Sequence, residues 1–167
     1  EWLYVWEKEE GMLHENVAAE ILCAMCRGEH MDRSEAKEGK IELTAVCDGL
    51  LKVNNEALKA VNGFGQMMIA TRHGNFGVKA GDKLAGTRII PLVIEEEKME
   101  GARKAAMDIT GGRPILSLLP FVHKKVGIVT TGNEVYTGRI KDTFTPVILE
   151  KLSEFDAEVI GHITLND

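Results

Sequence analysis

Apolar residues recur every three to four positions in several stretches of the chain, and this spacing predicts helices. In the first stretch, Val17, Ile21, Leu22 and Met25 form one apolar face, and Asn16 stands before it as the expected N-cap. The predicted helices are residues 17–26, residues 56–61 with Asn54 as the cap, residues 95–107 with an acidic first turn, and roughly residues 144–155.

Short alternating or continuously apolar runs between these helices predict strands. Residues 66–72 fit a strand or a helix, and residues 28–39 are polar enough to predict a loop or a frayed helix. Asp48-Gly49 predicts a tight turn, and Gly81-Asp82 predicts the turn of a β-hairpin. The predicted strands are residues 1–7, 40–46, 50–53, the two runs within 77–94, and residues 115–121, 126–129 and 157–164.

The order of these elements predicts two domains with a boundary near Val122. Residues 1–122 are expected to form a mixed α+β leading domain that contains the β-hairpin module. Residues 123–167 read strand, glycine loop, helix, strand, which is the start of an α/β domain with a parallel sheet. The chain opens on a strand without Met and stops just past one, so we expect a piece of a longer protein or its ordered part.

Composition narrows the function classes. A hydrophobic content of 44% is ordinary for a globular protein, and a net charge of -6 argues against a nucleic-acid partner, which requires a basic face. No apolar run is long enough for a membrane span. Cys23, Cys26 and Cys47 are too few for a disulfide framework, which suggests a cytoplasmic setting. A zinc site built from these cysteines and His30 is an alternative, but cysteines in an apolar helix more often pack as small hydrophobes.

Candidate chemistry lies where the apolar strand 126–129 runs into a glycine loop. Gly132 lets backbone N–H groups point at an anion, and Thr130 and Thr131 add hydroxyl donors. Gly138 permits a second sharp turn. A carboxylate at such a loop, here Glu134, is usually explained by a divalent cation between it and a phosphate. The loop therefore predicts a phosphate or metal–phosphate site.

The start of the following helix has two interpretations. Asp142 is either a ligand beside the loop or the helix cap, because a carboxylate is favoured at a helix N-terminus for structural reasons alone. Thr145 is the other candidate cap, and Pro146 favours it because proline is best tolerated at the first helical position. Asp167 follows the next strand and would lie at the same edge of a parallel sheet, so Glu134, Asp142 and Asp167 could face one crevice.

These residues resemble the molybdopterin-binding domain of molybdenum-cofactor biosynthesis proteins (MoeA/MoaB-like, in a divergent clostridial-type branch). The resemblance covers about the last 45 residues and consists of Thr131-Gly-Asn-Glu-Val135, Gly138, Asp142-Thr143 and the ending Asn166-Asp167. It implies a three-layer parallel-sheet fold, of which this chain holds a part, and a molybdopterin or adenylated molybdopterin ligand handled with Mg²⁺. It also implies a homo-oligomer, a dimer or trimer.

Carried over to this sequence, the resemblance implies a pterin site and a metal site, with a molybdopterin molybdotransferase-like activity as the enzymatic expectation. The implied metal ligands are Glu134, Asp142 and Asp167. The implied pterin-site residues are Thr130, Thr131, Gly132, Asn133, Glu134, Gly138, Asp142 and Thr143.

Two departures keep other functions open. Asn133 stands where the family has Asp, which removes a charge and weakens Mg²⁺ binding, and Phe144-Thr145-Pro146 replaces the usual helix start. The family's second Gly-Gly loop is also not contained in these 167 residues. One alternative is a relative of CinA-like nucleotide pyrophosphatases or amidases. The other is a non-catalytic molybdopterin carrier or sensor module.

Overall fold

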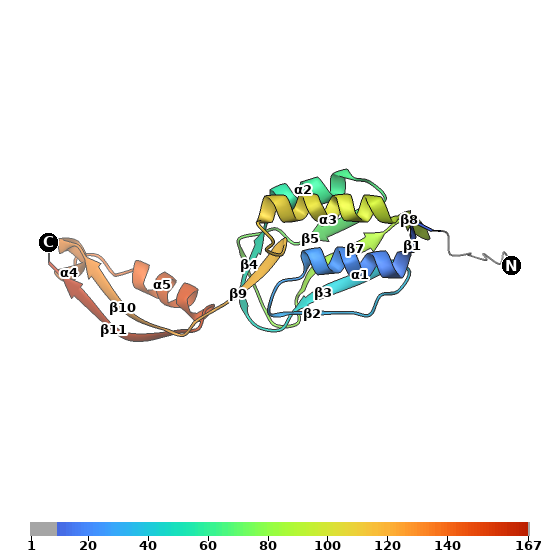
Figure 1. Cartoon of the computed structure of the whole chain (residues 1–167). Helices are drawn as coiled ribbons and strands as arrows, with labels where there is room; N and C mark the ends of the chain where they lie inside the picture. The colour runs from blue at the N-terminus through green and yellow to red at the C-terminus, as the bar shows by residue number, and fades with distance from the viewer. Residues whose placement is uncertain (1–9, 167) are drawn as a thin grey trace. The chain divides into compact units, whose positions relative to one another are not determined.

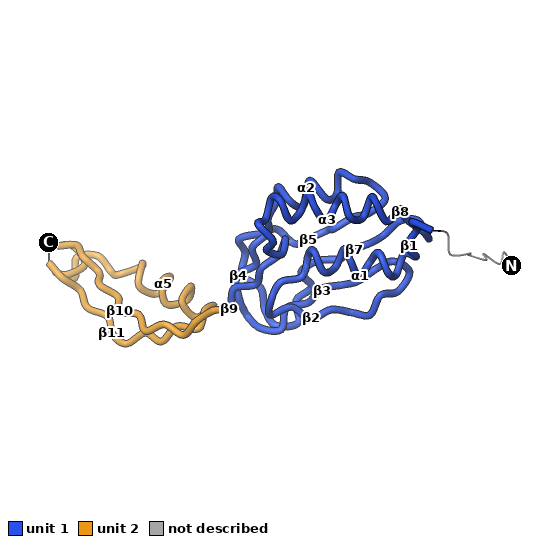
Figure 2. Tube along the Cα trace, in the orientation of Figure 1, with its two compact units in different colours: residues 1–120 blue, residues 121–167 orange. Residues whose placement is uncertain are grey.

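The computed structural model describes residues 10–166, and the chain divides into two compact units, Glu1–Pro120 and Phe121–Asp167 (Figure 2). The division falls close to the boundary expected at Val122. The strand expected over residues 1–7 and the candidate ligand Asp167 lie outside the described residues.

Unit 1 combines antiparallel sheets with helices (Figure 1). Asn54 caps α2 as predicted, because its side chain accepts a hydrogen bond from the N–H of Ala57. The ambiguous stretch 66–72 forms a strand. The elements of unit 1 are β1 Met12–His14, α1 Glu15–Cys26, β2 Met31–Arg33, β3 Lys40–Ala45, β4 Gly49–Val53, α2 Asn55–Gly63, β5 Met67–Thr71, β6 Phe76–Val78, β7 Lys83–Ile89, β8 Val93–Glu95, α3 Glu96–Thr110 and β9 Leu116–Pro120.

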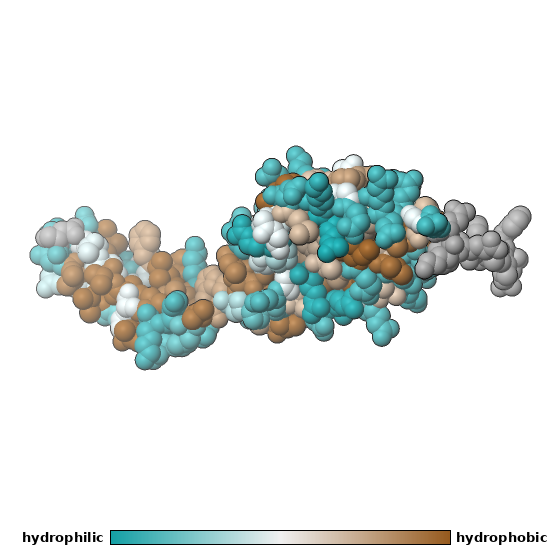
Figure 3. Space-filling view, viewed as in Figure 1, coloured by the Kyte–Doolittle hydropathy of each residue, from teal (hydrophilic) through white to brown (hydrophobic). Residues whose placement is uncertain are grey.

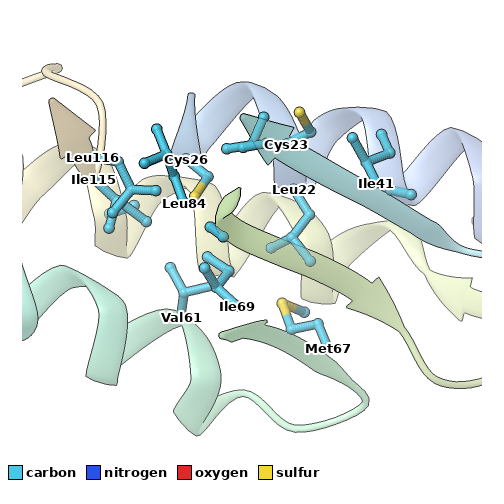
Figure 4. Packing of buried hydrophobic residues seen from close by; sticks show 14 of the residues in the cluster. Leu22, Cys23, Cys26, Ile41, Val61, Met67, Ile69, Leu84, Ile115 and Leu116 are labelled. Atoms are coloured by element: carbon cyan, nitrogen blue, oxygen red, sulfur yellow. The ribbon is translucent and has the colours of Figure 1, made fainter. Parts of the chain in front are cut away.

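A four-stranded antiparallel sheet, in the order β2-β3-β7-β5, forms one layer of unit 1. The cross-strand row Ile41, Thr87 and Ile69 is buried, since α1 packs on β3 and β7 while α2 packs on β5. Helix α3 lies against both α1 and α2. A second sheet, β6-β4-β9, closes the same core, which includes Leu22 and Leu116 (Figure 4).

Three local predictions for unit 1 are wrong. The Gly81-Asp82 turn exists, but β6 and β7 on its two sides enter different sheets, so the predicted hairpin does not form. The turn expected at Asp48-Gly49 is displaced, because the chain bends at residues 46–48 and Gly49 is already the first residue of β4, which belongs to a different sheet from β3. Residues 28–39 contain β2, which makes a hairpin with β3. Nonlocal pairing with β3, β4 and β5 decides these outcomes, and turn residues alone do not report it.

The predicted N-cap of α1 is also wrong. His14 is the N-cap, and its ring nitrogen accepts a hydrogen bond from the N–H of Asn16 at 3.2 Å. The Asn16 side chain instead accepts from the N–H of Gly39 at 2.9 Å and so fixes a distant loop. Asn16 is therefore used in a tertiary contact that a local cap signal cannot distinguish from capping.

Unit 2 is a parallel strand pair with helices. Its elements are β10 Lys124–Thr131, α4 Asn133–Tyr136, α5 Phe144–Ser153 and β11 Ala157–Leu165. Alternate residues of β10 are half-buried. On the opposite face Val129 and Ile163 are cross-strand partners, and they are 59% and 54% exposed. Apolar surface is accordingly visible over much of this unit in Figure 3.

Over the described residues the chain is thus mixed α/β, with five helices, several antiparallel pairings and one parallel pair. None of the helices in residues 10–166 combines the length and apolar character needed to cross a bilayer.

Candidate functional site

The glycine loop lies at the carboxyl end of β10, as the sequence predicts. Strand β10 runs parallel to β11, and Thr131 is opposite Leu165 at the last position of the register. Gly132 follows with a φ of 137°, a region that side chains disfavour, and the four-residue helix α4 begins directly after it. A Cβ at Gly132 would meet nothing within 4 Å, so its backbone angle and not its surroundings requires glycine.

A polar cluster of Thr130, Asp142, Thr145 and His162, here called the Thr130 cluster, joins the end of β10 to the start of α5 and to β11. The Thr130 hydroxyl lies 2.9 Å from Nε2 of His162 and 3.2 Å from the Thr145 hydroxyl. The Thr145 hydroxyl is 3.2 Å from the same ring nitrogen and donates to Oδ2 of Asp142. Thr145 is the only buried residue among those described in unit 2, so this cluster is the unit's best-packed point.

Asp142 acts structurally within this cluster. Its Oδ1 accepts hydrogen bonds from the N–H groups of Phe144 and Thr145, both at 3.0 Å, and Pro146 has no N–H to satisfy. The first three helical residues, 144–146, therefore leave no N–H group without a partner. The predicted cap Thr145 is wrong, because Thr143 is the N-cap residue and Asp142 supplies the acceptor. The hydrogen bonds from Thr145, then the one from the N–H of Phe144, and last the nearby His162 lower the pKa of Asp142.

The remaining predicted site residues lie on the loop itself. Asn133 and Glu134 open α4 and are exposed, and the backbone oxygen of Asn133 accepts from the Thr137 hydroxyl at 2.6 Å. Gly138 ends this turn with a φ of 73°. Thr131 and Thr143 are also exposed. The structure thus brings Thr130 and Asp142 into one cluster and leaves the Glu134 carboxylate outside it.

The expected metal ligands are only partly described. Within residues 10–166 no group of three or more His, Cys, Asp or Glu side chains lies close enough together to hold a metal ion. Asp167 lies outside the described residues, so the three-carboxylate site stays a prediction. The Glu134 carboxylate forms no hydrogen bond or ion pair with another described residue and remains accessible to a cation.

Sequence reasoning missed Thr145 and His162 as partners of the loop. His162 is opposite Ile128 in the parallel register, diagonal to Thr130 and 32 positions away in the chain. A register for β10 and β11 would have identified the pair, because side chains two residues apart share a face of a strand.

The alternative cysteine site is not assembled. Cys23 and Cys26 are both buried in the core of unit 1 (Figure 4). Burial raises the pKa of the Cys26 thiol to about 12 and also raises that of Cys23, so both remain protonated. They act as packing residues.

Comparison of the chain with protein-family models, curated protein sequences and solved structures gives no match.

Proposed function

We propose that the chain is a molybdopterin-binding protein of molybdenum cofactor biosynthesis, and that unit 2 supplies one edge of its MoeA/MoaB-like site. One observation carries the proposal: a glycine loop at the carboxyl end of a parallel strand is held beside α5 by the Thr130 cluster. Open α/β sheets bind anionic ligands at this edge. The loop residues from Thr131 to Glu134 are also those that carry the family resemblance.

The donor atoms of the loop suit Mg²⁺. Mg²⁺ prefers oxygen ligands and retains several waters, so one or two carboxylates plus substrate phosphates suffice. In this proposal Glu134 is the principal carboxylate, and the amide oxygen of Asn133 is a neutral neighbour. Thr131, Gly132 and Gly138 shape the loop around the phosphate. Bound Mg²⁺ would neutralise phosphate charge beside Glu134.

Asp142 takes a different part from the one the resemblance implies. Both of its carboxylate oxygens accept hydrogen bonds at the start of α5. Its main contribution is therefore to fix α5 and Thr130 beside the loop. A contact between Asp142 and the metal is secondary to this structural role. Asp142→Ala is expected to weaken pterin binding and lower the thermal midpoint together.

Titration calorimetry with molybdopterin, in Mg²⁺ and in chelator, tests the proposal. We expect saturable binding that weakens without Mg²⁺, and we expect Glu134→Gln to weaken the Mg²⁺-dependent binding about tenfold. Glu150→Gln, an exposed acid of α5, is the matched control and should leave binding unchanged. Absence of molybdopterin binding under both conditions would rule the proposal out.

The same protein separates the remaining functions. Asn133 removes a metal-binding charge and Asp142 is occupied as a cap, and both features favour a binding, carrier or sensor role over molybdotransferase activity. Molybdate transfer to bound molybdopterin would establish the enzyme. Hydrolysis of ADP-ribose with a divalent cation, without pterin binding, would instead establish the pyrophosphatase alternative. Sedimentation tests the proposed homo-oligomer.

A further inference from the structure

A hollow of about 450 Å³ lies between the carboxyl-terminal ends of α1 and α3, wholly within unit 1. This volume is within the range of roughly 300–1,000 Å³ that is usual for small-molecule sites. One part of its wall is apolar and the other is cationic. The apolar part includes Ile21, Met25, Met107 and Pro114.

Three arginines, Arg27, Arg103 and Arg113, are among the residues that line the hollow, and none of the described lining residues is Asp or Glu. Nε of Arg27 donates to the backbone oxygen of Met31 at 2.9 Å, and Nε of Arg113 donates to that of Thr110 at 3.1 Å. These bonds fix two guanidinium groups while leaving their terminal N–H groups for a ligand. Arg103 is held less firmly, because its ion pair with Glu100 is exposed and measures 3.5 Å.

The Gly111-Gly112 turn builds this arrangement. The two residues have φ values of 65° and 80°, and the N–H of Gly112 donates to the backbone oxygen of Met107 at 3.1 Å. Consecutive positive φ angles are readily adopted only by glycine, and they end α3 and turn the chain back over its last turn. Arg113 follows at once and is held against the end of that helix.

The electrostatic balance favours an anion. The ends of α1 and α3 place backbone oxygens here, and each helix end carries a partial charge of about −0.5. Three full guanidinium charges exceed these two partial charges, even with Glu100 near Arg103. The apolar wall formed with Met107 and Ile21 suits a hydrocarbon body attached to the anionic group.

We propose that this hollow is a binding site for a small organic anion, a phosphate monoester or carboxylate carried on an apolar body. The anionic group lies against Arg27 and Arg113, while the body packs on the apolar wall. The inference does not depend on the pterin proposal, because every residue in it belongs to unit 1.

Calorimetric titration of the whole chain with 1-naphthyl phosphate tests this site. We expect saturable binding, with Kd raised about fivefold or more by Arg27→Gln and by Arg113→Gln. Arg88→Gln, an exposed arginine of β7 outside the hollow, is the matched control and should not change Kd. The neutral 1-naphthol and inorganic phosphate should each bind more weakly, and 1-naphthoate separates carboxylate from phosphate recognition. No saturable binding of either naphthyl anion, or equal effects of all three arginine variants, overturns the proposal.

Discussion

Strand β5 pairs with β7 along one edge, and a single side chain bonds its backbone on the other edge, so removing that side chain has a calculable effect. Asn62 in α2 accepts a hydrogen bond from the N–H of Ile69 at 2.8 Å and donates to its backbone oxygen at 3.0 Å. Its amide thus takes the place that a further strand would occupy. Losing two such bonds costs about 2 kcal/mol in the free energy of unfolding, and the helix propensity of alanine returns about 0.5 kcal/mol. Asn62→Ala should therefore destabilise unit 1 by about 1.5 kcal/mol.

Thermal unfolding followed by circular dichroism, together with hydrogen exchange, checks this estimate. A loss of about 1.5 kcal/mol corresponds to a fall of roughly 6 °C in a unit of this size. The amide of Ile69 should also exchange faster, because its acceptor has gone. Asn55→Ala is the control, an exposed asparagine of the same helix, and should stay within about 0.5 kcal/mol of the parent. Equal midpoints for the two variants, or retained protection at Ile69, would refute the reasoning.

Three further changes test other parts of the structure. The new Cβ of Gly28→Ala would overlap the backbone oxygen at the start of β9, so this change should lower the free energy of unfolding by about 1–3 kcal/mol in a thermal melt. The new Cβ of Gly63→Ala meets nothing within 4 Å, so this change should raise the free energy of unfolding by up to about 1 kcal/mol. Equal losses in the two variants would contradict this. The hydrogen bond to Asp156 raises the pKa of His123, so the pair stabilises unit 2 below the unfolded histidine pKa and loses this effect as pH rises through the raised value. Asp156→Asn should lower the pKa of His123 in an NMR titration, and an unchanged titration would exclude the pairing. Of the three thiols, only half-buried Cys47 should react with an aromatic disulfide reagent in the native protein, and rapid labelling of the two core cysteines would show that they are not buried.

Elements governed by neighbouring residues were predictable from the sequence. The Asn54 cap acts on an amide three positions away, and α3 follows from its acidic first turn and the basic residues near the end of the predicted helix. Strand β2 was missed because Met31–Arg33 is short and mostly polar, and pairing with β3 stabilises it. The turn at Gly81 was recognised but its pairing was not, since the partners of β6 and β7 are distant in sequence. Local chemistry therefore specifies turns and caps, while nonlocal pairing specifies the sheets.

In the candidate site, too, the local features were predictable from the sequence and the nonlocal contacts were not. The position of Gly132 at a strand end follows from the order of apolar residues, and the structure agrees. The helix cap did not follow, because Pro146 lies at the third helical position, where its missing N–H removes an unsatisfied donor. Thr145 and His162 could not be assigned without the register of β10 and β11. Sequence reasoning located the loop, and tertiary structure identified what holds it.

In unit 2 the same hydrogen bonds hold the glycine loop in place and cap α5. Asp142 bonds the first turn of α5 and the Thr145 hydroxyl, which in turn contacts Thr130 at the end of β10. Hydrogen bonds to its carboxylate lower the pKa of Asp142, so its stabilising effect is present above the usual value of about 3.9 and is lost as pH falls through the depressed value. Acid protonation should therefore release α5 and the loop together. At neutral pH the cap is fully charged, and it holds the loop beside the start of α5 without any ligand to order the helix.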